Sequence, residues 1–108
     1  MTQRQGLFTV QTWLILTARQ RARLEWLVRQ QGGDLADTLS RIVAEHPLDR
    51  LPGTAQPAGE PLPVRVFLTA EQREAFERWV EANKIPLPDL LSQIVAAHLA
   101  GLPDPPER

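Results

Sequence analysis

Residues 39–46 read LSRIVAEH, and residues 91–98 read LSQIVAAH. The similarity is wider than these eight positions, because Leu16–His46 aligns with Leu68–His98 without a gap. Fifteen of the 31 aligned pairs are identical, and some of the others exchange similar residues, such as Leu24 with Phe76 and Leu27 with Trp79. A repeat of this kind indicates a structural unit that the chain contains twice.

The segment between the two copies, HPLDRLPGTAQPAGEPLPV, is rich in proline and glycine, a composition typical of a linker. The chain ends in GLPDPPER, which we expect to be frayed. With 108 residues the chain is long enough for one compact domain. We therefore expect a single domain, 1–108, made of repeat one at 10–48, a linker at 49–61, repeat two at 62–100 and a flexible tail at 101–108.

The composition argues against several classes of function. Cysteine is absent, which excludes disulfides, thiolate catalysis and cysteine-ligated zinc, and two histidines supply a metal site poorly. No arrangement resembles a nucleophile with its base, a phosphate loop or a pair of catalytic carboxylates, so we expect no enzyme activity and no cofactor. No run of about 18 apolar residues is present, and we expect no membrane span and a cytoplasmic location.

Charge is distributed unevenly along the chain. The net charge is −1 overall, with +2 on residues 1–50 and −3 on residues 51–108. Nucleic-acid-binding proteins usually carry a basic excess, which the chain as a whole lacks.

Each copy begins with a pattern that predicts a strand followed by a helix. In TWLILT and VRVFLT, apolar residues recur at every second position, as in a strand with one buried face. Thr17 with Gln20, and Thr69 with Gln72, have the spacing of a capping box at the start of a helix. The apolar residues of each predicted helix then form one stripe: Leu24, Leu27 and Val28 in the first copy, and Phe76, Trp79 and Val80 in the second.

A break and a second helix complete each copy. Gly32 and Gly33 suit the end of a helix, and Asp34 suits the N-cap of the next one. Pro86 and Pro88 occupy the corresponding break in the second copy. The predicted core residues of the second helices are Leu35, Leu39, Ile42, Val43, Leu87, Leu91, Ile94 and Val95.

One strand and two short helices cannot bury their apolar faces alone, so the two copies must share a core. We expect the strands to pair as an antiparallel ribbon with the four helices over one side. The expected fold class is mainly α with a two-stranded antiparallel β-ribbon, built from two β-α-α repeats in one chain.

The order of these parts resembles the ribbon-helix-helix family, the class of Arc, MetJ and CopG, over about residues 10–48 and 62–100. The features that carry the resemblance are an alternating strand, an immediate threonine cap, a short helix, a break, and a second helix that ends near a histidine. Family members usually assemble the fold from two identical chains. The resemblance therefore implies an intramolecular ribbon-helix-helix pseudo-dimer, for which further self-association remains open.

Ribbon-helix-helix proteins typically insert the ribbon into the major groove of DNA. The resemblance therefore implies a transcription regulator or accessory factor that binds double-stranded DNA. Gln11 and Arg65 have side chains suited to base edges, and Arg19, Arg21 and Arg23 are either phosphate contacts or a solvated helix face. The six matching ribbon positions are Gln11, Trp13, Ile15, Pro63, Arg65 and Phe67.

Other residues favour a protein–protein interaction module that docks another protein or a second copy without binding DNA. Trp13, Ile15 and Phe67 form an apolar patch, and such a patch more often marks a protein contact or a surface that another segment covers. The family often has Ser, Thr or Lys at the start of the second helix, where N–H groups hold a phosphate. This chain has Asp34 there in one copy and Pro86 in the other.

Five further residues carry smaller predictions. Trp13 and Arg65 occupy matched positions, so we expect them opposite or diagonal to one another in a cation–π contact. Trp26 lies off the stripe of its helix, where it covers the linker or anchors a partner. His46 and His98 are expected to stabilise helix C-termini or to lie partly buried, and not to form a metal site.

Overall fold

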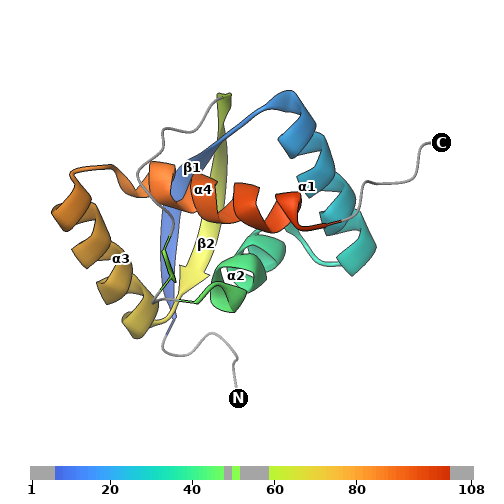
Figure 1. Ribbon diagram of the computed structural model, residues 1–108. Helices are drawn as coiled ribbons and strands as arrows, with labels where there is room; N and C mark the ends of the chain where they lie inside the picture. Colours follow the sequence, from blue (N-terminus) through green and yellow to red (C-terminus); the bar gives the residue numbers. More distant parts are fainter. Residues whose placement is uncertain (1–6, 48–49, 52–58, 103–108) are drawn as a thin grey trace, which may run out of the picture.

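The computed structural model describes residues 7–47, 50–51 and 59–102. Figure 1 shows two strands side by side, with α1 and α3 on opposite sides of the molecule. The order β-α-α-β-α-α fits the two expected β-α-α repeats. The elements are β1 (Phe8–Leu16), α1 (Ala18–Gln31), α2 (Leu35–Glu45), β2 (Glu60–Leu68), α3 (Ala70–Asn83) and α4 (Leu87–Ala100).

The expected fold class, mainly α, is wrong. Each strand has nine residues, and the two pair antiparallel along their whole length, so the fold is a mixed α/β one. The strands begin at Phe8 and Glu60, before the expected repeat boundaries at 10 and 62. The expected linker extended to residue 61, yet Pro61 lies inside β2 together with Pro63.

The pairing explains why these prolines do not interrupt the strand. The Phe67 N–H donates to the Ser40 hydroxyl (2.9 Å) and not to the opposite strand. Because backbone N–H groups alternate in direction along a strand, Pro61 and Pro63 occupy positions whose nitrogen also faces away from β1. Proline is tolerated where no ladder hydrogen bond is needed.

Both predicted capping boxes are confirmed. Gln20 N–H donates to the Thr17 hydroxyl (3.1 Å), and Thr17 N–H donates to the Gln20 side chain (2.9 Å). Thr69 and Gln72 repeat this geometry at 2.8 and 3.1 Å. Each strand therefore passes into its helix through one residue, which fixes the entry angle of α1 and α3.

The two breaks use different residues for the same purpose. Gly32 ends α1 in the left-handed conformation (φ 79°), and Lys84 ends α3 in the same region (φ 58°). Glycine adopts this conformation without a Cβ clash, whereas lysine accepts some strain there. Asp34 caps α2 as predicted, and Pro86 precedes α4 without a side-chain cap.

The core lies between the ribbon and the helices, with residues from both repeats. Leu39 and Leu91 are fully buried, and Leu35 and Leu87 of the predicted set are only half-buried. Trp26 packs against the core from a partly buried position. The buried apolar residues are Leu14, Leu16, Leu24, Leu27, Leu39, Ile42, Val43, Val64, Val66, Leu68, Phe76, Leu90, Leu91, Ile94, Val95 and Leu99.

Each strand is covered by the second helix of the other repeat. Helix α4 packs against β1, and α2 packs against β2. Ile15 N–H donates to the Ser92 hydroxyl (2.7 Å), just as Phe67 N–H donates to Ser40. These two serines are the second residues of the repeated octapeptides. Each repeated octapeptide thus supplies a hydroxyl that accepts an edge N–H of the other repeat's strand. A single repeat lacks the helix that covers its own strand.

Some sequence predictions fall beyond the described residues. Helix α4 ends at Ala100 with Gly101 as its C-cap, and residues 103–108 of the expected flexible tail lie outside the described residues. The expected contact between Trp26 and the linker concerns mainly 52–58, which also lie outside. Within the part of the chain that the structure describes, no helix has the length and apolar character needed to cross a membrane.

Candidate nucleic-acid interface

The ribbon has one face toward the helices and one face toward the surface. Residues at even positions in both strands, such as Leu14 and Val66, point into the core. Residues at odd positions point the other way because side chains alternate along a strand. This outer ribbon face consists of Thr9, Gln11, Trp13, Ile15, Pro61, Pro63, Arg65 and Phe67.

The register divides the outer ribbon face into two unlike halves. Thr12 pairs with Val64, its matched position in the other repeat, so the two-fold-like axis of the ribbon passes through this pair. On one side of the axis Gln11 lies opposite Arg65; on the other, Trp13 lies opposite Pro63. We call Thr9, Gln11, Arg65 and Phe67 the Arg65 half, and Trp13, Ile15, Pro61 and Pro63 the Trp13 half.

The two halves differ in chemistry. Arg65 is the one charged residue of the outer ribbon face, and no ion pair or hydrogen bond engages its side chain among the described residues. Trp13 is 48% exposed, which is high for a tryptophan, and Ile15 and Phe67 are half-buried. The Arg65 half therefore has hydrogen-bonding groups at its centre, and the Trp13 half has no charge and no side-chain hydrogen-bonding group except the Trp13 indole N–H.

Trp13 and Arg65 lie diagonal to one another, which is one of the two predicted arrangements. Their direct partners are Pro63 and Gln11, so they are offset by two residues across the ribbon. The described residues show no cation–π contact between them. The cation–π contact that is described joins Arg73 to Phe8, with the guanidinium carbon 4.6 Å from the ring centroid.

A groove of about 590 Å³ lies beside the ribbon at the start of α2. Asp34, Leu35 and Ala36 line it together with Arg65 and Trp13. The Asp34 carboxylate accepts the Asp37 N–H at 2.8 Å, so the side chain occupies one of the helix N–H groups that a phosphate would otherwise use. The negative charge of Asp34 also opposes phosphate binding at this helix start.

The three candidate arginines on α1 do not form one phosphate track. The Arg23 guanidinium donates to the Leu102 carbonyl at 2.7 Å and ties α1 to the end of α4. Arg21 lies 3.5 Å from Glu25 in an exposed i,i+4 ion pair. Successive positions two apart differ by about 200° around a helix, so Arg21 points away from Arg19 and Arg23. Arg19 alone remains as an exposed candidate near the end of the ribbon.

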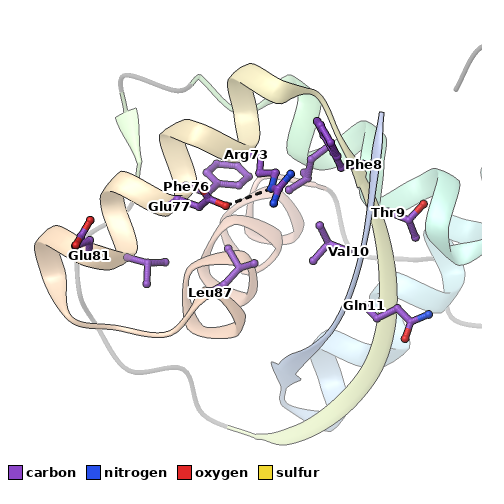
Figure 2. Close-up of a pocket in the computed structure, with 11 residues that line it drawn as sticks. Phe8, Thr9, Val10, Gln11, Arg73, Phe76, Glu77, Glu81 and Leu87 are labelled. Atoms are coloured by element: carbon purple, nitrogen blue, oxygen red, sulfur yellow. Dashed lines mark hydrogen bonds and ion pairs between the residues drawn. The ribbon is translucent and has the colours of Figure 1, made fainter. Parts of the chain in front are cut away.

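A second groove, of about 630 Å³, lies between the start of β1 and α3. Figure 2 shows Val10, Phe76 and Leu87 between these elements, whereas Gln11 points away from them. At the rim, Arg73 covers the Phe8 ring and pairs with Glu77 at 3.2 Å. Most of the apolar lining of this groove comes from residues that also border the core, so the groove is a gap between packed elements, and it reaches the outer ribbon face only at Thr9 and Gln11.

His46 and His98 line the same cavity of about 220 Å³, between the ends of α2 and α4. The His46 ring lies 2.9 Å from the Arg50 carbonyl oxygen. Among the described residues, no group of three or more histidine, aspartate or glutamate side chains is placed to hold a metal ion.

Two residues of the outer ribbon face were missed from the sequence, Thr9 and Pro61. The alternation of apolar residues continues through FTVQ and EPLP, and this signal was hidden in β2 by the two prolines. The division into two halves was also missed, because it depends on which pair of residues lies at the centre of the ribbon.

Comparison with protein-family models, curated proteins and solved structures finds no match for this chain. The resemblance to ribbon-helix-helix proteins is therefore a prediction from the sequence, and the observed order of elements fits the two expected repeats.

Proposed function

We propose that this protein is a ribbon-helix-helix relative that binds double-stranded DNA by placing its outer ribbon face in the major groove, as a transcription regulator or accessory factor. The observation that supports this most strongly is the uncovered ribbon with Arg65 opposite Gln11 beside its centre. Arginine suits guanine O6 and N7, and glutamine suits adenine N6 and N7. The chain acts as a binding protein and not as an enzyme, without a cofactor, and we place it in the cytoplasm.

The dimensions of the outer ribbon face favour a groove over a flat protein surface. Nine-residue strands are about 30 Å long, and a pair of strands with side chains is about 10 Å wide. The major groove is about 12 Å wide and admits a two-stranded ribbon. The same face offers only about 300 Å² to a flat partner, well below the roughly 800 Å² per side of a stable protein interface.

The electrostatics predict moderate affinity. Arg65 and Arg19 are exposed, but Arg21 and Arg23 are engaged within the chain, and Asp34 lines the groove beside the ribbon. Each phosphate neutralised adds about 0.9 to the slope of log affinity against log salt. With two or three such contacts, affinity should fall roughly tenfold to fortyfold between 50 and 200 mM salt.

Fluorescence anisotropy with labelled duplexes tests the proposal. Binding at 50 mM salt should weaken at 200 mM, and Arg65→Ala should weaken it by a further factor of about ten or more. Arg78→Ala is the matched control, because Arg78 is an exposed arginine on α3, away from the ribbon. Absence of duplex binding at 50 mM salt, or equal effects of the two substitutions, would contradict the proposal.

The exposed Trp13 supports a second candidate function, in which the outer ribbon face docks a protein. Trp13, Ile15, Pro61 and Pro63 form a continuous apolar strip across both strands. Tryptophan is enriched at the energetic centres of protein interfaces. Such a partner would need contacts beyond the ribbon to reach a stable interface area. Loss of a partner on Trp13→Ala, with duplex binding absent, would favour this candidate.

A further inference from the structure

From the register of the ribbon we infer that the DNA site is not a palindrome: its two sides are read by different chemistry. This inference rests on the proposed DNA binding. Across the Thr12–Val64 centre, the pair Gln11 and Arg65 faces one side of the site, and the pair Trp13 and Pro63 faces the other. A ribbon of two identical strands would present the same pair on both sides and would favour an inverted repeat.

The Arg65 half selects by hydrogen bonds. The odd-numbered pairs of this ribbon are non-hydrogen-bonded pairs, because their N–H groups point away from the partner strand. Side chains of such pairs lie close together. Gln11 and Arg65 therefore present one combined cluster of donors and acceptors. A bidentate arginine contact specifies guanine, and a bidentate glutamine contact specifies adenine. This side of the site should therefore contain guanine with an adjacent adenine.

The Trp13 half selects by apolar contact. Trp13, Pro63 and Ile15 present no charge, and of the three only the Trp13 indole N–H is a side-chain hydrogen-bond donor. In the major groove, the group that matches an apolar surface is the C5-methyl of thymine. Cytosine would place its N4 amino group against these side chains without an acceptor. This side of the site should therefore be rich in thymine.

The spacing follows from the strand geometry. The two central pairs lie two residues apart, which is about 7 Å along the ribbon, or about two base-pair steps at 3.4 Å each. The outer ribbon face from Thr9 to Ile15 covers about 20 Å. The expected motif is thus about six base pairs long, with guanine and adenine on one side of its centre and thymine on the other.

Selection from a pool of random duplexes with the full chain tests this inference. The enriched motif should be non-palindromic, and Arg65→Ala should remove the guanine preference while the thymine preference remains. Arg78→Ala should leave both unchanged. A palindromic motif, or binding without any sequence preference, would overturn the inference but not the proposed DNA binding. Absence of duplex binding would overturn both.

Two further measurements compare the two sides of the DNA site and the two halves of the ribbon. Replacing thymine by deoxyuridine removes only the methyl group, and on the Trp13 side this should weaken wild-type binding about threefold to tenfold, with little change on the other side. The double substitution Trp13→Arg with Pro63→Gln gives both halves the same pair, and its enriched motif should become a palindrome of the guanine-containing side. A deoxyuridine effect equal on both sides, or an unchanged motif for a folded double variant, would overturn the inference.

Discussion

Most matched positions of the two repeats are identical in the second helices, seven of the eleven pairs from 35–45 and 87–97, whereas all four matched pairs of the outer ribbon face differ. Leu39 and Leu91 are the same residue, as are Ser40 and Ser92, and each pair has the same place in the fold. At the ribbon, by contrast, Trp13 is matched by Arg65. The repeats thus share contacts that build the core and differ at the outer ribbon face, where we propose that DNA binds.

The first helices of the repeats also differ. Helix α1 packs against α2 and α4, and Arg23 binds the Leu102 carbonyl at the end of α4. Helix α3 packs against α4, and an apolar groove separates it from the start of β1. The two first helices can therefore differ in their contacts, because the buried residues on the second helices and the ribbon carry most of the packing.

The largest effect should come from removing one repeat. A chain that ends at residue 50 has β1 without the Ser92 hydroxyl and without α4. It should be unfolded, or should dimerise so that each copy covers the other. Circular dichroism and sedimentation equilibrium can distinguish these states. A monomer that unfolds cooperatively would show that one repeat folds by itself and would contradict the shared core.

The next largest effect should come from truncating matched core residues. Leu39→Ala and Leu91→Ala each remove a side chain with 0% exposure, and each should reduce the free energy of unfolding by about 2–5 kcal/mol. Urea denaturation measures the loss. Leu35→Ala, at a half-buried position, is the control and should lose less. A loss below about 0.5 kcal/mol at both buried sites would contradict the shared core.

The matched serines should show a smaller and unequal effect. Ser92→Ala leaves the Ile15 N–H without its partner and should destabilise the protein by about 1–3 kcal/mol. Ser40 is only half-buried, so water can replace its hydroxyl and Ser40→Ala should cost less. Amide hydrogen exchange at Ile15 and Phe67 provides a local measurement. Equal protection in wild type and both variants would rule out the proposed role of these serines.

One substitution at a position where the repeats differ should stabilise the protein, whereas the substitutions above should destabilise it. The Thr38 hydroxyl is buried without a hydrogen-bond partner among the described residues, and the matched position is Leu90. Thr38→Val keeps the shape and removes the hydroxyl, so it should raise the free energy of unfolding by about 1 kcal/mol. Thermal unfolding can detect this increase. A lower midpoint would mean that the hydroxyl has a partner in solution.

The smallest effect concerns charge beside the ribbon. Asparagine caps a helix about as well as aspartate, so Asp34→Asn should keep α2 intact while removing a negative charge from the groove beside Arg65. Duplex affinity should rise roughly threefold, a surface charge effect below about 1 kcal/mol. Glu81→Gln removes the same charge on α3 and should have no effect. Weaker binding by Asp34→Asn would contradict contact with DNA at this groove.

Local signals in the sequence predicted most of the helical framework. The capping boxes, the breaks at Gly32 and Pro86, and the core positions Leu39 and Leu91 each depend on neighbours along the chain or on helical spacing. The length of β2 was missed because Pro61 is compatible with a strand only when its nitrogen faces away from the partner strand, which depends on the register.

In the candidate site too, local features were predicted from the sequence and long-range features were not. Six of the eight residues of the outer ribbon face were predicted from the resemblance to the ribbon positions of the family, but their grouping depends on long-range pairing. Sequence alone did not show that Arg23 is engaged by the Leu102 carbonyl, because this contact joins residues far apart in the chain. It also did not indicate that Gln11 and Arg65 share one side of the ribbon while Trp13 and Pro63 share the other.

The central claim is that the outer ribbon face enters the DNA, and Trp13 can report this directly. Replacing Trp26 and Trp79 by phenylalanine leaves Trp13, 48% exposed, as the single tryptophan. Acrylamide should quench it efficiently in the free protein and much less once a duplex is bound. A chain that keeps only Trp79, on α3, should show no such change. Duplex binding that leaves the quenching of Trp13 unchanged would place the DNA elsewhere on the molecule and contradict the account.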